Sequence, residues 1–109
     1  MKPIDYRNDT WEMVQGRMLA DERYKVWQAF RHHGPGTTRE VATRSGIDLL
    51  NLRPRATELY QLGFLILVAS IPDQTHEGIY TALGYDQARE KFHDAKRNAS
   101  GYQTELQLK

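Results

Sequence analysis

Residues 37–65 read TTREVATRSGIDLLNLRPRATELYQLGFL, and their spacing predicts two helices joined by a turn. Thr37 to Glu40 has the pattern of a capping box, in which a threonine hydroxyl and a glutamate three residues later satisfy backbone amides at the start of a helix. Val41 and Ala42 are the apolar residues of this helix, and Gly46 supplies the left-handed residue that ends it. The first helix is therefore expected to have only about two turns.

A longer amphipathic helix is predicted after the turn at Gly46. Ile47 is expected to pack inward, and Asp48 is expected to cap the helix. Apolar positions then recur at intervals of four, three and four, which turns one face of the helix toward a core. These positions are Leu52, Ala56, Leu59 and Gly63, and the glycine is expected to end the helix.

Pro54 is the unusual residue of this helix. An interior proline removes one backbone hydrogen bond and crowds the carbonyl four residues earlier, so the helix either bends or begins late. We favour a start near Leu50 or Asn51, which places Pro54 in the first turn, where its missing amide proton would have no internal partner. Leu49 and Leu50 would then lie in the turn, with Leu50 available for an exposed apolar contact.

Two further helices are predicted before residue 37. In the first, Asp9 to Glu12 has the spacing of a capping box with Asp9 as the cap, and the helix is expected to run to about Leu19. Asp21-Glu22 suits the positive end of the second helix, which Gly34-Pro35-Gly36 ends. We interpret the aromatic residues of both helices as core packing rather than as a platform for stacked bases. The apolar faces consist of Trp11, Val14 and Met18 in the first helix and Tyr24, Val26, Trp27 and Phe30 in the second.

Two apolar runs after residue 63 predict a hairpin. Phe64 to Val68 is expected to form a buried strand, and Ile79 to Leu83 a second strand beyond a polar loop at residues 72–78.

A last helix is predicted from Tyr85 to about Arg97, followed by a polar, poorly ordered tail from Asn98 to Lys109. Its apolar stripe has two interpretations. The stripe closes the core, which we favour slightly, or it pairs with its copy in a homodimer. The stripe consists of Tyr85, Ala88, Phe92 and Ala95.

Length and composition limit the class of protein. A chain of 109 residues suits one domain, in which we expect an N-terminal arm and helix at 1–20, a central unit at 21–84 and a C-terminal helix and tail at 85–109. The absence of cysteine excludes disulfides and thiolate zinc sites. The longest apolar run has six residues, and no apolar signal-peptide segment opens the chain. We therefore expect a cytoplasmic protein without a membrane partner.

The formal net charge is only +1, but the charge is unevenly distributed. Residues 31–55 hold five arginines against two acidic residues, a net charge of +3, which leaves −2 for the rest of the chain. The positive charge is therefore concentrated on residues 31–55, and all of it is arginine. The plain alternative is that Arg53 and Arg55 pair with Glu58 and Asp48 as ordinary solvated helix charges.

Enzyme and metal functions find little support. The four histidines have no HExxH spacing and no accompanying cysteine, so no metal site and no cofactor is expected. No glycine-rich phosphate loop, nucleophile elbow or evident carboxylate pair is present, and we do not expect an enzyme.

The order of three helices and a two-stranded hairpin resembles that of winged helix-turn-helix domains. The segment GIDLLNLRPRATELYQLGFL is similar to that family's recognition helix and first wing strand, and the resemblance covers about Asp21 to Leu83. Leu59, Gly63 and Phe64-Leu65 occupy the places where family members carry an apolar residue, a glycine and an apolar pair. The small winged domains of bacterial regulators and of bacteriophage genomes are the most similar.

The resemblance implies an α+β, mostly helical fold with a three-helix core, a two-stranded wing and extra terminal helices. It implies double-stranded DNA as the partner and transcriptional or phage-encoded regulation as the role. The base-reading helix would run from about 50 to 62, with side chains whose hydrogen-bonding groups match base edges, and the preceding helix would hold phosphates. The expected base contacts are Asn51, Arg53, Arg55 and Glu58, and the expected phosphate contacts are Thr37, Thr38, Arg39, Arg44 and Arg31, with His32 extending them.

The expected wing departs from the family pattern. Family members often place arginine or lysine at the tip, whereas this loop holds Asp73, Glu77 and a largely neutral His76. Such a loop would repel phosphate, so either the wing lies away from the duplex or the domain contacts something other than DNA. The alternative function is a winged module that binds protein and not DNA.

Overall fold

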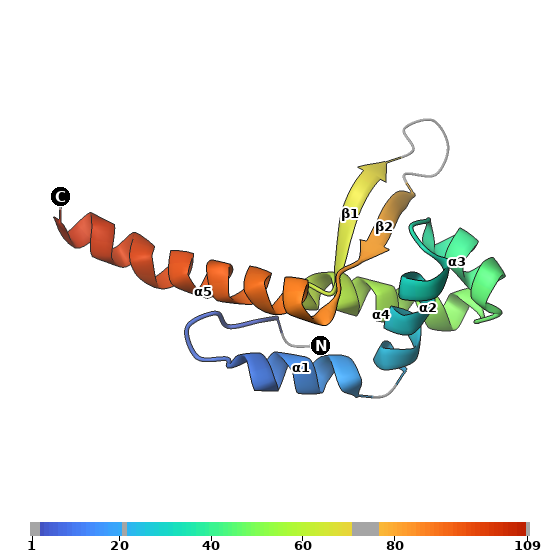
Figure 1. Ribbon diagram of the computed structural model, residues 1–109, viewed down its shortest axis with the longest axis horizontal. Coiled ribbons are helices and arrows are strands. Elements are labelled where there is room, and N and C mark those ends of the chain that lie inside the picture. Colours follow the sequence, from blue (N-terminus) through green and yellow to red (C-terminus); the bar gives the residue numbers. More distant parts are fainter. Residues whose placement is uncertain (1–2, 21, 71–76, 109) are drawn as a thin grey trace.

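The computed structural model describes residues 3–20, 22–70 and 77–108, and it has an α+β, mostly helical architecture (Figure 1). Within these residues there are five helices and one two-stranded antiparallel hairpin, which confirms the expected coarse class. In chain order the elements are α1 (Trp11–Leu19), α2 (Arg23–His33), α3 (Thr38–Ser45), α4 (Leu49–Leu62), β1 (Leu65–Ser70), β2 (Gly78–Ala82) and α5 (Tyr85–Leu108).

The core lies between α1, α2, α3, α4 and the first part of α5, and aromatic rings fill much of it. Phe64 is fully buried, with its ring centroid 5.5 Å from that of Trp11 and 6.0 Å from that of Trp27. The indole Nε1 of Trp27 donates a hydrogen bond to the carbonyl of Leu83 at 3.1 Å, which satisfies the one polar group of this buried ring. Trp27 and Phe30 are both buried, so their interpretation as core residues is confirmed.

The cap of α1 differs from the prediction. Thr10 is the N-cap, and its hydroxyl accepts a hydrogen bond from the amide of Met13. The carboxylate of Asp9 instead accepts from the amide of Asp5 at 2.9 Å and pairs with Arg17 at 3.0 Å. Asp9 was therefore wrongly assigned as the cap, because either residue type can cap a helix and the position of Arg17 decided between them.

The start of α4 also differs from the prediction. Asp48 is the N-cap, as expected, but the helix begins at Leu49, and Pro54 is its sixth residue rather than a member of the first turn. The expected late start, with Leu49 and Leu50 in the turn, was wrong because the Asp48 cap fixes the start: its carboxylate accepts from the Leu50 amide at 3.4 Å. The helix tolerates Pro54 although the Leu50 carbonyl thereby loses its usual donor.

The hairpin is buried only at its base. Leu65 is fully buried opposite Ala82, whereas Leu67 and Val68 are about half exposed, and the register shifts between Leu67 and Ala69. The expectation of a buried β1 therefore holds only for its first residues, because the strands project away from the helices (Figure 1).

Two hydrogen bonds attach the hairpin to the segment before α3. The amide of Gly36 donates to the carbonyl of Tyr80 at 3.1 Å, and the amide of Tyr80 donates to the carbonyl of Gly36 at 2.9 Å. They hold β2 beside the start of α3. The predicted loop residues Asp73 and His76 lie outside the described residues.

Helix α5 is longer than expected. It continues to Leu108 through most of the tail that was predicted to be poorly ordered, so the predicted end at Arg97 was wrong. No proline interrupts the tail, and the one glycine in it costs a helix only about 1 kcal/mol. Ala88 and Phe92 are buried in the core of this chain, as the favoured interpretation of the stripe required. None of the helices in the described ranges has both the length and the apolar character needed to cross a bilayer.

Candidate nucleic-acid interface

The α3–α4 unit is built from local signals. The hydroxyl of Thr37 accepts from the amide of Glu40 at 3.1 Å, and the Glu40 carboxylate accepts from the amide of Thr37 at 3.0 Å, which confirms the capping box. Gly46 ends α3 with φ of 77°, a left-handed conformation that favours glycine. Ile47 and Asp48 then complete a three-residue connection to α4. The two helices are consequently joined by a short turn whose geometry Gly46 and the Asp48 cap determine.

One face of the first half of α4 is exposed to solvent. Leu50 is 77% exposed, the highest fraction among the exposed large apolar residues of the described chain, and Asn51 beside it is also exposed. The buried face of the helix contains Leu52, Ala56 and Leu59, as the spacing predicted, and also Leu62.

Arg39 of α3 and Arg53 of α4 lie at one edge of this surface. Their guanidinium groups converge on the same carboxylate oxygen of Glu77, with Arg39 Nε at 3.4 Å and Arg53 Nη2 at 3.5 Å from Oε1. Arg39 is 62% exposed and Arg53 47% exposed, whereas Glu77 is only 19% exposed. The structure therefore brings together one expected base contact and one expected phosphate contact, with an acidic residue between them.

Arg55 and Glu58 form contacts within the fold instead. The Glu58 carboxylate pairs with Arg23 of α2 at 3.0 Å and lies 2.6 Å from Arg55 Nε, without hydrogen-bond geometry for the second contact. Glu58 is 15% exposed, and Arg23 also donates to the Arg17 carbonyl at 2.8 Å. Glu58 is thus committed to joining α4 to α2. It is poorly placed to accept from a cytosine, and Arg55 forms the pair with Glu58 that was the plain alternative in the sequence.

The remaining expected phosphate contacts have local partners. Thr37 is 2% exposed and its hydroxyl is occupied as a cap, so its side chain is not accessible to a phosphate. Arg44 donates to the carbonyls of His33 and Pro35 and to Glu40, which fastens α3 to the end of α2. The guanidinium carbon of Arg31 lies 5.0 Å from the ring centroid of Trp27. Thr38, the first residue of α3, is partly exposed.

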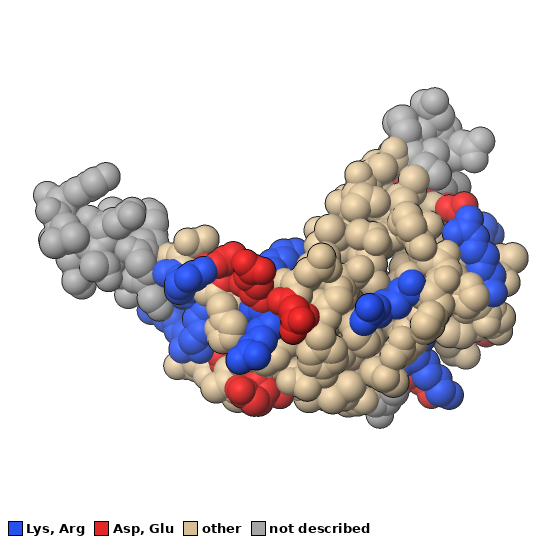
Figure 2. Space-filling view, viewed as in Figure 1, with Lys and Arg blue, Asp and Glu red and all other residues tan. Residues whose placement is uncertain are grey.

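The charge on the surface is mixed. On the face shown in Figure 2, acidic and basic side chains stand next to one another both along α5 and at the opposite end of the molecule. The excess of arginine between residues 31 and 55 is therefore partly neutralised by acidic residues from elsewhere in the fold, chiefly Glu58 and Glu77.

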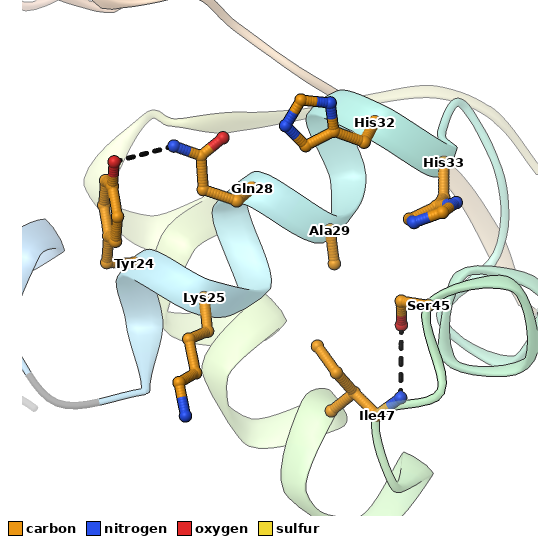
Figure 3. A pocket seen from close by; sticks show the side chains of 8 residues that line it. All are labelled: Tyr24, Lys25, Gln28, Ala29, His32, His33, Ser45 and Ile47. Atoms are coloured by element: carbon orange, nitrogen blue, oxygen red, sulfur yellow. Dashed lines mark hydrogen bonds between the residues drawn. The ribbon is translucent and has the colours of Figure 1, made fainter.

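Two hollows flank the α3–α4 turn and share Ile47 as a wall. One, of about 390 Å³, lies at the start of α4, where Leu50 and Pro54 give it an apolar side. The other, of about 310 Å³, lies between α2 and the turn (Figure 3). Its remaining lining residues are Tyr24, Lys25, Gln28, Ala29, His32, His33 and Ser45.

The polar residues of the second hollow are engaged with each other or point apart. Gln28 Nε2 donates to the Tyr24 hydroxyl at 2.7 Å, and His32 and His33 project to different sides of the last turn of α2 (Figure 3). The described part of the chain contains no group of three side chains placed to hold a metal ion.

No protein family, curated protein or solved structure matches this chain.

The sequence did not reveal Glu77 as the partner of Arg39 and Arg53. It identified Glu77 only as a negative charge in the loop between the strands. Glu77 follows Arg39 by 38 positions and Arg53 by 24 positions in the sequence. No local pattern predicts a contact over such a separation.

Proposed function

We propose that this chain binds double-stranded DNA as a winged helix-turn-helix domain, with α4 as the recognition helix and the β1–β2 hairpin as the wing. The observation that carries the proposal is the exposed first half of α4, beside α3 and across a three-residue turn. An α-helix has the dimensions to enter the major groove, and the residues that this surface presents match what a groove offers. By resemblance, the biological role is that of a transcriptional regulator of the small bacterial or bacteriophage type.

The exposed residues of α3 and α4 divide into two roles. Asn51 can bond twice to an adenine edge, and Leu50 supplies an apolar contact of the kind that thymine methyl groups accept. Arg39 and Arg53 lie at the edge of this surface and supply its accessible positive charge. We no longer propose Arg55 and Glu58 as base contacts, because they contact each other and Glu58 also pairs with Arg23 of α2.

The test is fluorescence anisotropy with a labelled mixed-sequence duplex across a salt series. We compare the wild type with an Arg39→Ala, Arg53→Ala double variant, leaving Arg55 in place because it contacts Glu58. The matched control is Arg89→Ala, Lys91→Ala, which removes two positive charges from exposed positions of α5. The expected result is wild-type binding that weakens steeply with salt, since binding releases counterions from DNA.

The double variant should bind about 10-fold or more weakly at low salt, with a log–log salt slope smaller by about two. The control should bind like the wild type. Absence of wild-type binding at low salt would overturn DNA binding itself. Equal losses in the variant and the control would overturn the assignment to α3 and α4.

The second candidate function is protein binding through the same end of the molecule. Leu50 favours it, because this exposed leucine borders an apolar-sided hollow with Ile47 and Pro54. Because Leu50 is also a proposed DNA contact, wild-type DNA binding and its salt dependence distinguish the two functions, and a Leu50→Ser variant then locates the protein-binding surface. If the wild type fails to bind DNA but binds a partner protein whose affinity the variant lowers and salt does not, the protein-binding function replaces our proposal.

A further inference from the structure

Arg39 and Arg53 contact the same carboxylate oxygen of Glu77 and come from two different helices. Arg39 comes from α3 and Arg53 from α4, and both lie within 3.5 Å of Glu77 Oε1. Glu77 lies immediately before β2, and the Gly36–Tyr80 hydrogen bonds hold that strand beside the start of α3. The position of β2 therefore places the Glu77 carboxylate beside the two arginines.

This arrangement is one that suits a phosphate. Guanidinium groups bind carboxylate and phosphate oxygens in the same way, with N–H donors directed at a negatively charged oxygen. Two arginines converging on one oxygen would give a phosphate oxygen charge-assisted contacts from both helices. The position also lies at the edge of the α3–α4 surface, where a duplex backbone would pass if α4 entered the groove.

The contacts made by Glu77 are weak enough to be exchanged. Both arginines are about half exposed or more, and an ion pair with an exposed partner contributes little to stability because water competes for both charges. The distances of 3.4 and 3.5 Å are also longer than those of strong charge-assisted hydrogen bonds.

We infer that Arg39 and Arg53 form a binding position for one DNA phosphate, and that Glu77 occupies this position in the free protein and limits DNA affinity. The inference rests on the proposed function. It assigns Arg53 to the DNA backbone rather than to a base. It also accounts for the acidic residue in the wing, which competes with the duplex for the two arginines.

The test uses Glu77→Gln in the same anisotropy experiment. Glutamine keeps the size of the side chain but removes the charge that competes with a phosphate. The expected result at low salt is binding tighter by about 3- to 10-fold, with a salt slope steeper by about one because one repelling charge is gone. Glu90→Gln, an equal change of charge at an exposed position of α5, is the control and should bind like the wild type.

Adding Glu77→Gln to the Arg39→Ala, Arg53→Ala variant tests whether the gain depends on these arginines. The gain should shrink to less than about 2-fold, because the proposed phosphate position no longer exists. Two results would overturn the inference while leaving DNA binding intact: a Glu77→Gln variant no tighter than the Glu90→Gln control, or an undiminished gain without the two arginines. Absence of wild-type binding would instead overturn the proposed function.

Arg53→Ala alone separates backbone contact from base reading. Against duplexes of different sequence, the loss should be uniform within about 2-fold, since phosphates carry no sequence information. A loss confined to duplexes that contain particular bases would return Arg53 to the base-reading role.

Discussion

Replacing Glu58 with glutamine should destabilise the fold, because this carboxylate joins α4 to α2. Its Oε2 lies 3.0 Å from Arg23 Nη2, and its Oε1 lies 2.6 Å from Arg55 Nε. Glu58 and Arg23 are 15% and 14% exposed, so water replaces little of the lost interaction. Glutamine has nearly the same shape and can still accept one hydrogen bond from Arg23. The change therefore removes the charge and keeps most of the packing.

The magnitude follows from the distance and the burial. Two unit charges about 3 Å apart attract by roughly 5 kcal/mol at an effective dielectric constant of about 20, before the desolvation cost is subtracted. Removing one partner of a buried pair costs about 3–5 kcal/mol. Residual exposure and the remaining hydrogen bond reduce this to about 2–3 kcal/mol. With an unfolding entropy of about 2.1 cal/mol/K per residue, the expected fall in Tm is roughly 10 °C.

Urea and thermal unfolding followed by circular dichroism measure this effect. Glu90→Gln on α5 is the control and should unfold within about 0.5 kcal/mol of the wild type. DNA affinity of Glu58→Gln, measured well below its Tm, should be unchanged. A Glu58→Gln variant as stable as the control would refute the reasoning. Unchanged stability together with weaker, sequence-dependent DNA binding would restore Glu58 to the base-reading set.

Three further changes test the interior of α4, the core and the cap of α3. Pro54→Ala should raise the free energy of unfolding by about 1–2 kcal/mol, because the new amide can donate to the Leu50 carbonyl and this gain exceeds the entropy that proline removes from the unfolded chain. Phe92→Ala should lower it by about 3 kcal/mol through the cavity it leaves, and the wild-type Tm should not vary with protein concentration, because this ring is buried within its own chain. The backbone hydrogen bond from Thr37 is the largest cause that holds the pKa of Glu40 below its ordinary 4.5, so its ionised form stabilises the fold above pH 4.5, and this contribution is lost as the pH falls below 4.5 through the lowered pKa. In denaturant titrations at pH 7 and pH 3, the wild type should therefore lose more stability on acidification than Glu40→Gln.

Each of these expectations has a result that contradicts it. A less stable Pro54→Ala would mean that the proline is favourable where it stands in α4; Gln61→Ala, at an exposed position of the same helix, is its control. A wild-type Tm that rises with protein concentration would support the homodimer interpretation of the α5 stripe. Equal acid sensitivity of the wild type and Glu40→Gln would show that the capping box makes no net contribution through ionisation.

Much of the fold depends on residues close together in the chain, and the sequence determined that part. The Thr37 capping box, the Asp48 cap and the glycine that ends each of α3 and α4 are interactions over one to four residues. Their geometry is set by the local backbone, so residue type and spacing suffice to predict them. The buried face of α4 and most of that of α2 follow from the helical period in the same way. Tyr24 was wrongly expected on the apolar face of α2, because it lies in the first turn of the helix and is 39% exposed.

Local patterns failed where several residues compete for one role. Asp9 and Thr10 can both cap α1, and the distant partner Arg17 decides which does so. Pro54 suits a late helix start as well as an interior position, and the Asp48 cap, which accepts from the Leu50 amide, starts the helix at Leu49.

The accessible chemistry of the surface was decided only by the tertiary structure. The sequence identified Asn51 and Arg53 as available side chains, and both are exposed. The sequence did not predict the ion pair between Glu58 and Arg23, which are 35 positions apart, or the one between Glu77 and Arg39, which are 38 positions apart. Ion pairing depends on distance in space, and folding brings these charges together without any repeating signal along the chain. The sequence therefore determined which helices form and which faces they bury, and the packing of α2, α4 and the hairpin decided which charges stay accessible.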